Sequence, residues 1–476
     1  MATSDDKYNS VAGFVYIFNL IVGAGALTLP RAFSEAGLLL SAIVVVTLAF
    51  LSFVTCSFMV ESMAIANAFL KGNYQETENE GMTNEEKNLL ENSINEESLF
   101  KIEKKVEMGE MARMFFGKIG IRLFYLCIAI YLYGDLAIYA TAVPKSLRDV
   151  ICEKSSSPAA NSSHSHVANV SNATNSSTTS PKKDNCFGLK EDTVYRIIVA
   201  AFAVLVGPFA FTNVQKTKYI QYITTLLRWL CFGLMIVVAV VRLGRNKGAG
   251  TPSIADFSGT PDLFGASVYS FMCQHSLPSL ITPLRSKRHV NSILFLDVGV
   301  ALLFYSLLSF TALFTFKKVN IKDVYTSSFN SNPTAISKIL SLYPVFALSA
   351  SFPVICITLR ENLKALFRRG DEQFSWPVER ILIPLCAVLP PIAIALCTTD
   401  VEMLVGITGS YAGVGVQYII PTMLLYYGRQ KAFQTYDTYK NEFASWFRHK
   451  VWIWIILIWT LFSVSVVTAF HIKKRS

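Results

Sequence analysis

The sequence predicts an all-α polytopic membrane protein, built as a five-plus-five inverted repeat of helices with one additional helix. Three observations support this fold class. The chain is 52% hydrophobic and has a mean hydropathy of +0.41, which is high for a soluble protein. It contains eleven apolar stretches of membrane-spanning length. The first and the sixth stretch both contain helix-breaking residues, and matching interruptions in two halves are typical of inverted-repeat membrane proteins.

The apolar stretches define a single membrane domain that covers residues 1–476. The first repeat comprises residues 11–242, the second comprises residues 263–427, and the eleventh helix lies at 450–471. The first seven residues are polar and not basic, so we expect no cleavable signal peptide before the first span. We expect the spans at residues 12–33, 38–63, 119–147, 193–213, 218–242, 263–284, 291–316, 335–358, 379–398, 402–427 and 450–471.

The basic residues predict the orientation of the chain in the membrane. The formal net charge is +10, and most of the basic residues in short connections fall on one side if the spans alternate. These connections include residues 216–218, 285–288, 360–369, 429–431 and 448–450. Because short cytosolic loops are enriched in Lys and Arg, we predict a cytosolic N-terminus and a luminal or extracellular C-terminus. The charge is therefore not evidence for binding to nucleic acid.

The same orientation places the loop 148–192 in the lumen or outside the cell. Cys152 and Cys186 bracket this loop, and an oxidising compartment favours a disulfide between them, with two unrelated free thiols as the alternative. The loop also holds four sequons for N-glycosylation, at Asn161, Asn169, Asn172 and Asn175.

The long cytosolic loop 70–108 is acidic and has few apolar residues, so we predict that it is largely disordered. Glu85, Leu89 and Leu90 have the acidic dileucine spacing that clathrin adaptors bind on flexible segments, although a chance leucine pair is the alternative. The last part of the segment, residues 106–116, has apolar residues at helical spacing, which predicts a helix along the membrane interface.

The first span contains Gly23, Gly25 and Pro30 within a short region. Such a break is tolerated at membrane depth only where the backbone is buried in protein or lines a cavity. An opened helix presents free N–H groups to a carboxylate and free carbonyls to an ammonium group. We therefore predict an amino acid site at Gly23, Ala24 and Gly25. The alternative is close helix packing through small residues.

The sixth span repeats this arrangement. Cys273, Gln274 and His275 form a polar run before Pro278, whose missing N–H leaves carbonyls of the preceding turn unpaired. His275 either binds substrate or a proton, or is satisfied by neighbouring helices. The size of the pocket would depend on nearby aromatic residues such as Tyr269.

Charged residues at membrane depth are costly and usually face a cavity or one another. Arg228 either occupies the position of a coupling cation or pairs with Asp135. Glu61 and Asp297 lie nearer the cytosolic interface, where we expect them to be solvated or associated with a gate. The hydroxyl of Ser351 in the eighth span either binds a sodium ion or bonds to its own helix.

The segment 19–33 resembles the first-helix signature of the amino acid/auxin permease family, within the APC superfamily, which includes sodium-coupled neutral amino acid transporters. The segments 271–280 and 404–411 are similar to the sixth and tenth helices of that family. The resemblance implies alternating access around a carboxylate-binding turn at 23–25. In sodium-coupled relatives an Asn of the first helix and a Thr of the eighth serve the ion. Asn19 matches the first position, whereas Ser351 stands at the second and Arg228 is a departure.

Together these features predict a secondary transporter for a small neutral amino acid or related zwitterionic solute, coupled to sodium or protons. We expect it in an endolysosomal or plasma membrane. The alternative is a solute-binding sensor or scaffold that does not transport and that signals through the acidic loop. The sequence has no cluster with metal-ligand spacing and no nucleophile with a His–acid partner set, so we expect neither an enzyme nor a cofactor.

Overall fold

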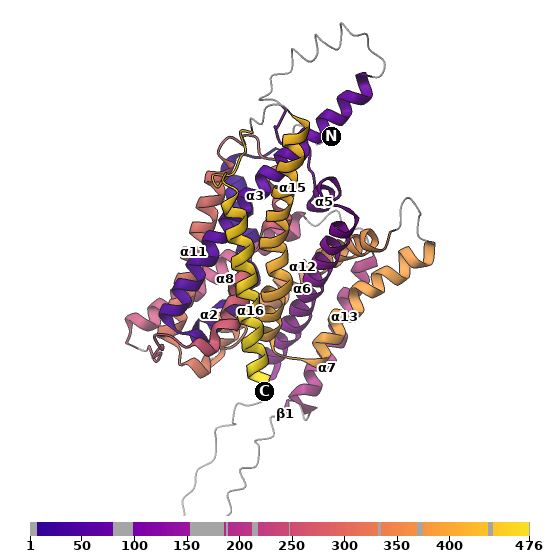
Figure 1. Cartoon of the computed structure of the whole chain (residues 1–476). Coiled ribbons are helices and arrows are strands. Elements are labelled where there is room, and N and C mark those ends of the chain that lie inside the picture. The colour runs from indigo at the N-terminus through magenta and orange to yellow at the C-terminus, as the bar shows by residue number, and fades with distance from the viewer. Residues whose placement is uncertain are drawn as a thin grey trace, which may run out of the picture.

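The computed structural model describes residues 7–79, 99–152, 185–186, 189–211, 218–246, 248–331, 335–368, 375–436 and 441–475. In these residues the chain forms a bundle of long helices, and the two ends of the chain lie at opposite ends of the bundle (Figure 1). The four predicted sequons and the dileucine residues lie outside the described residues.

The N-terminal half consists of helices and one short hairpin. Its elements are α1 (Ser10–Ile21), α2 (Gly25–Ala36), α3 (Leu38–Asn79), α5 (Met108–Phe115), α6 (Lys118–Cys152), β1 (Asn185–Cys186), β2 (Leu189–Lys190), α7 (Glu191–Val206), η4 (Gly207–Phe211) and α8 (Lys218–Gly244). The two strands pair antiparallel.

In the C-terminal half the regular elements among the described residues are all helices. Its elements are η5 (Phe257–Gly259), α9 (Thr260–Ser270), η6 (Gln274–Ser276), α10 (Leu277–Ile281), α11 (Val290–Thr315), η7 (Lys318–Asn320), η8 (Tyr325–Ser331), α12 (Ala335–Phe367), η9 (Val378–Leu382), α13 (Ile383–Cys397), α14 (Val401–Thr408), η10 (Gly409–Gly413), η11 (Gly415–Ile419), α15 (Ile420–Thr435) and α16 (Val451–Arg475).

The helix lengths confirm an all-α polytopic membrane protein. Among the described residues, nine helices are long and apolar enough to cross a membrane, and the bent pair α1–α2 makes a tenth candidate. The remaining predicted span, 263–284, is divided between α9, η6 and α10, none of which is long enough alone. The count of eleven crossings therefore stays a prediction.

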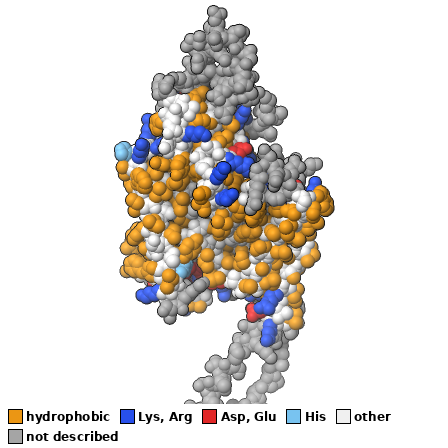
Figure 2. All heavy atoms as spheres, turned by 45° about the vertical axis from the view of Figure 1, so that its right-hand side comes forward, with side chains coloured by type: hydrophobic (Ala, Val, Ile, Leu, Met, Phe, Trp, Pro, Cys, Tyr) orange, Lys and Arg blue, Asp and Glu red, His pale blue; other side chains and the backbone are white. Residues whose placement is uncertain are grey.

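The surface fits a bilayer environment. Hydrophobic side chains cover the waist of the molecule, whereas Lys and Arg gather towards its two ends (Figure 2). Leu226, Leu303 and Leu461 are among the apolar residues that remain exposed on long helices. A protein in water rarely exposes so large a continuous apolar surface, so this band faces lipid.

The described ends of the acidic loop are ordered, whereas its middle, residues 80–98, lies outside the described residues, so the prediction of a largely disordered loop stays a prediction. Helix α3 continues to Asn79, and the segment after the gap packs its apolar side chains, such as Phe100 and Val106, into the core. The buried Asn67 side chain holds this segment, because its Oδ1 accepts from the amides of Glu103 and Lys104 at 3.0 and 2.8 Å. The low mean hydropathy of the whole loop did not indicate that a few of its residues are buried. The helix predicted within residues 106–116 is confirmed as α5, and its place along the membrane interface stays a prediction.

The predicted disulfide between Cys152 and Cys186 is formed. It joins the end of α6 to β1 and thereby fixes the hairpin that precedes α7.

We expect Cys152→Ser to lower the free energy of unfolding by about 2–4 kcal/mol, because the chain between the two cysteines is no longer closed in the unfolded state. Thermal unfolding of the purified protein measures the change. Cys386→Ser is the control, because Cys386 is a free, exposed cysteine. Equal melting temperatures for the two variants would contradict the structural role of the disulfide.

Candidate functional site

The first helix break separates α1 from α2. Helix α1 ends at Ile21, α2 begins at Gly25, and their axes differ by 54°. The amides of Ala24 and Gly25 donate to no carbonyl of the described backbone, whereas Gly23 donates to Ile21 at 2.8 Å in a tight turn. The break therefore leaves two adjacent N–H groups available inside the protein, as the sequence predicted.

The second break lies between α9 and α10. Helix α9 ends at Ser270, and the three residues that follow lead into η6. The carbonyl of Phe271 accepts a hydrogen bond from the Ser52 hydroxyl of α3 at 2.9 Å. The backbone of this second break is therefore supported by a neighbouring helix rather than by its own helical ladder.

Tyr305 of α11 connects the two breaks. Its hydroxyl donates to the carbonyl of Ile21 at 2.7 Å, and the carbonyl of Ser270 lies within hydrogen-bonding distance at 3.0 Å. Tyr305 is completely buried. An unpaired carbonyl in an apolar interior costs free energy, so one side chain here stabilises the open end of both broken helices.

Gly25 and Gly23 have different roles. A Cβ atom at Gly25 would lie 2.3 Å from Ser270 Oγ and 2.6 Å from Ser270 Cα, so only glycine allows α2 and α9 to approach this closely. A Cβ atom at Gly23 would meet nothing nearer than the Leu20 carbonyl at 3.6 Å. The alternative of close packing therefore accounts for Gly25, whereas packing does not require a glycine at 23.

Two of the predicted substrate-binding side chains face α3 instead of an open site. Gln274 Nε2 donates to Ser52 Oγ at 3.2 Å and to Thr55 Oγ1 at 3.0 Å, and its Oε1 accepts from the Cys273 amide at 3.0 Å. Cys273 Sγ lies 3.3 Å from Cys56 Sγ. These contacts fix the shape of the second break.

Tyr269 and His275 lie on the side of the breaks that faces α6, the helix that carries Asp135. The Tyr269 hydroxyl donates to the Asp135 carboxylate, which is buried. The His275 ring is 5.7 Å from the Tyr131 ring, measured between centroids, and its Nδ1 has no hydrogen-bond partner among the described residues. The alternative that neighbouring helices satisfy all hydrogen-bonding groups of His275 therefore does not hold for Nδ1.

Arg228 interacts with the first break and not with Asp135. Its guanidinium donates to the carbonyl of Asn19 in α1, and it also contacts the Tyr343 hydroxyl of α12. Asp135 and Arg228 form no ion pair with each other in the described part of the chain. The guanidinium thus carries a fixed positive charge where α1, α8 and α12 meet.

The two predicted sodium ligands make ordinary contacts. Asn19 Oδ1 accepts from the Trp229 indole at 2.9 Å, and its Nδ2 has no partner among the described residues. The Ser351 hydroxyl donates to the Ala347 carbonyl of its own helix at 3.0 Å, which is the alternative that the sequence left open. A role for either residue in ion binding stays a prediction.

The expectation that Glu61 and Asp297 are solvated is wrong, because both side chains have no exposed surface. Glu61 pairs with Arg429, and both oxygens of Asp297 lack a hydrogen-bond partner among the described residues. The positions of Glu61 and Asp297 close to the predicted interface did not reveal that a loop covers this end of the bundle.

Contacts at each end of the bundle hold the broken helices to other segments. At one end, Tyr8 donates from its amide to the Pro283 carbonyl at 3.2 Å, and its hydroxyl donates to the Leu280 carbonyl. Burial raises the pKa of Tyr8 to about 12, so this donor keeps its proton at physiological pH. At the other end, Nε of Arg31 in α2 lies 3.5 Å from Oε2 of Glu402 in α14. Sequence reasoning missed these pairs because the partners are hundreds of residues apart.

The glycine-rich tenth span, residues 406–415, is both interrupted and closely packed. It contains the π-helical turns η10 and η11, which interrupt the regular hydrogen-bond ladder. A Cβ atom at Gly409 would lie 2.0 Å from the Gly265 carbonyl of α9, so the helix also packs closely on the second broken helix.

The fold and the site define a class: an all-α polytopic membrane protein with two broken helices in contact in its interior. The sequence model of the family described as transmembrane amino acid transporter protein matches residues 7–473, and the chain belongs to this family. The chain is 45% identical to transmembrane protein 104 of Mus musculus over 99% of its length and 98% of the relative's. It is 38% identical to the transmembrane protein 104 homolog of Drosophila melanogaster, over 97% and 96%.

The two glycines of the first break make a direct comparison. We expect Gly25→Ala to lower the free energy of unfolding by about 1–3 kcal/mol, because the new Cβ atom pushes α2 away from Ser270. Gly23→Ala should leave the melting temperature almost unchanged. The thermal unfolding curves of the two purified variants provide the test. An equal loss of stability at both positions would contradict the assignment of Gly25 alone to packing.

Proposed function

We propose that the chain is a secondary transporter for a small neutral amino acid or related zwitterionic solute. The observation that carries this proposal is the pair of broken helices in contact, with free amides at Ala24 and Gly25 in the interior. A carboxylate accepts hydrogen bonds from such amides, and the N-terminal end of α2 adds a favourable dipole. Carbonyls near the breaks and the aromatic side chains of Tyr131 and Tyr269 would surround the ammonium group.

The contacts at the two ends of the broken helices support an alternating-access cycle. We infer that the contacts of Tyr8 and those of Arg31 act as the two gates, which separate in turn. The proposed cycle therefore opens one end at a time while the breaks keep hold of the solute.

We further propose that Arg228 takes the place of a coupling sodium ion. A sodium ion near the first helix would be held by backbone carbonyls, and the Asn19 carbonyl is already occupied by the guanidinium. A second cation in the same position would be repelled by this fixed charge. Transport through such a site is independent of sodium, and a proton is then the remaining candidate for coupling.

We also propose which membrane contains the protein. The dileucine spacing at 85–90 and the sequons at 161–175 favour an endolysosomal or plasma membrane, with N-glycans on the luminal or extracellular side.

The transport proposal is tested by the uptake of a mixed panel of radiolabelled neutral amino acids into proteoliposomes, with sodium and pH varied separately. We expect uptake above that of protein-free liposomes, which does not change when sodium is replaced by a larger cation. Binding of solute without uptake would favour the sensor and would contradict transport.

The role of Arg228 has a separate test in the same assay. We expect Arg228→Ala to alter the sodium dependence of uptake, because the position for a cation is vacated, whereas Arg228→Lys keeps the charge and the wild-type behaviour. Arg242→Ala is the control, since Arg242 belongs to the same helix but lies over the rings of Phe316 and Phe329. If Arg228→Ala leaves the sodium dependence unchanged, the fixed-cation proposal is wrong.

A further inference from the structure

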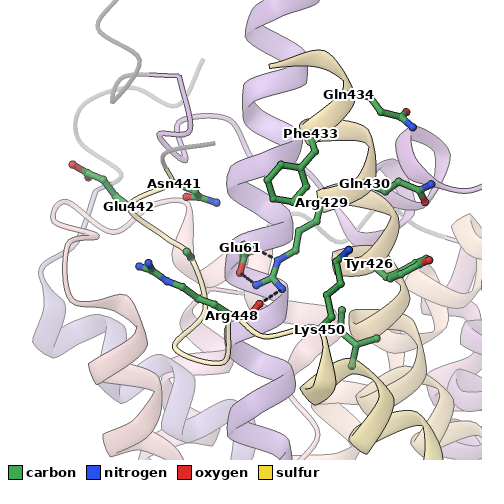
Figure 3. Close-up of a pocket in the computed structure, with 12 residues that line it drawn as sticks. Glu61, Tyr426, Arg429, Gln430, Phe433, Gln434, Asn441, Glu442, Arg448 and Lys450 are labelled. Carbon is green, nitrogen blue, oxygen red and sulfur yellow. Dashed lines mark hydrogen bonds and ion pairs between the residues drawn. The ribbon is translucent and has the colours of Figure 1, made fainter. Parts of the chain in front are cut away.

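A cavity of about 800 Å³ opens at the end of the bundle where α3, α15 and the start of α16 meet. The residues that line it belong to these helices and to the connection 441–450, and neither helix break contributes to it. Figure 3 shows the polar and charged side chains arranged around its mouth. The transport cycle proposed above does not use this cavity.

A buried ion pair forms the floor of the cavity. Arg429 Nε and Nη2 donate to the two carboxylate oxygens of Glu61 at 2.7 and 2.8 Å. The same carboxylate accepts from the Ser445 amide at 2.7 Å, and Arg429 Nη1 donates to the Arg448 carbonyl at 3.0 Å. These bonds hold the connection 441–450 against α3 and α15, so the cavity has a rigid base. Because Glu61 is neutralised by Arg429, it does not repel an anion.

Two basic residues at the rim have no acidic partner. Arg448 and Lys450 are exposed, and neither forms an ion pair with an acidic residue of the described chain. In Figure 3 the Lys450 side chain extends towards Arg429 and Tyr426, whereas the side chains of Arg448 and Glu442 extend away from them. The mouth of the cavity therefore has an excess of positive charge together with polar hydrogen-bonding groups.

The cavity lies at the level of the lipid headgroups. Trp446 and Trp454 flank the rim in the sequence and are 56% and 57% exposed, and Trp and Tyr concentrate at membrane–water interfaces. Phe433 and Ile453 add apolar surface to the lining. A ligand with a charged head and an apolar tail would match both the basic rim and the apolar lining of the cavity. A small soluble anion would leave the apolar lining in contact with water.

We propose that this cavity binds the phosphate-bearing headgroup of an anionic membrane lipid. Lys450 contacts the phosphate oxygens, and the exposed Arg448 side chain turns towards them when the headgroup binds. Tyr426 and Gln430 supply further hydrogen bonds, and the acyl chains lie along α15 and α16. Basic pockets between transmembrane helices suit such headgroups, because the charges stay close to the membrane surface and the phosphate accepts several charge-assisted hydrogen bonds.

The test uses the purified full-length protein in detergent and measures dissociation constants for four probes. These are a short-chain phosphatidylinositol bisphosphate, short-chain phosphatidylserine, short-chain phosphatidylcholine and soluble inositol trisphosphate. We expect the first lipid to bind most tightly, with phosphatidylserine weaker and phosphatidylcholine at background. The double variant Arg448→Ala/Lys450→Ala should weaken binding of the first lipid by about tenfold or more, since two charges near the phosphate are lost.

The matched control removes two exposed arginines from another connection, Arg285→Ala/Arg288→Ala, and should leave binding unchanged. Melting temperatures confirm that each variant is folded, and Lys450→Glu gives the same test with one exposed substitution. Wild-type affinity in Arg448→Ala/Lys450→Ala or in Lys450→Glu, or equal binding of phosphatidylcholine, would overturn the proposal. Binding of soluble inositol trisphosphate as tightly as the lipid would overturn the assignment to a lipid.

Discussion

The need to satisfy backbone groups in an apolar interior constrains this whole structure. Each helix break frees carbonyls that water cannot reach, and each freed carbonyl costs several kcal/mol unless it finds a donor. Tyr305, Ser52 and Arg228 come from three different helices and supply these donors. The helices around the breaks are therefore positioned by polar contacts at a few points, in addition to the packing of apolar side chains.

The two broken helices behave as one unit in their contacts. Gly25 brings α2 against the end of α9, and Tyr8 ties the start of α1 to the end of α10. Each part of one broken helix thus has a partner in the other. A movement of α1 relative to the bundle would carry α10 with it, which is the kind of coupled displacement that an alternating-access cycle requires.

Local signals in the sequence were sufficient for the fold class and for the breaks. Gly23, Gly25 and Pro278 act through their own backbone chemistry, and Cys152 and Cys186 stood out by their place in a polar loop. The ion pair of Glu61 with Arg429 could not be predicted in the same way, because its partners are 368 residues apart and each resembles an ordinary interfacial residue. The sequence also did not show that Gln274 faces α3, since spacing along a broken helix does not define direction.

The shared hydroxyl of Tyr305 has a consequence for chemical selectivity. A phenol has one proton, and the oxygens of Ile21 and Ser270 both lie within its reach, so it donates to only one of them at a time. The Ile21 oxygen also accepts from the Gly23 amide, so the Ser270 oxygen is the one that lacks a donor when the phenol turns to Ile21. A primary ammonium ion brings three protons and could donate to this oxygen, whereas a fully methylated nitrogen, as in betaine, brings none. Discrimination between a primary ammonium ion and a methylated one would thus arise from a shortage of hydrogen-bond donors and not from the size of the solute.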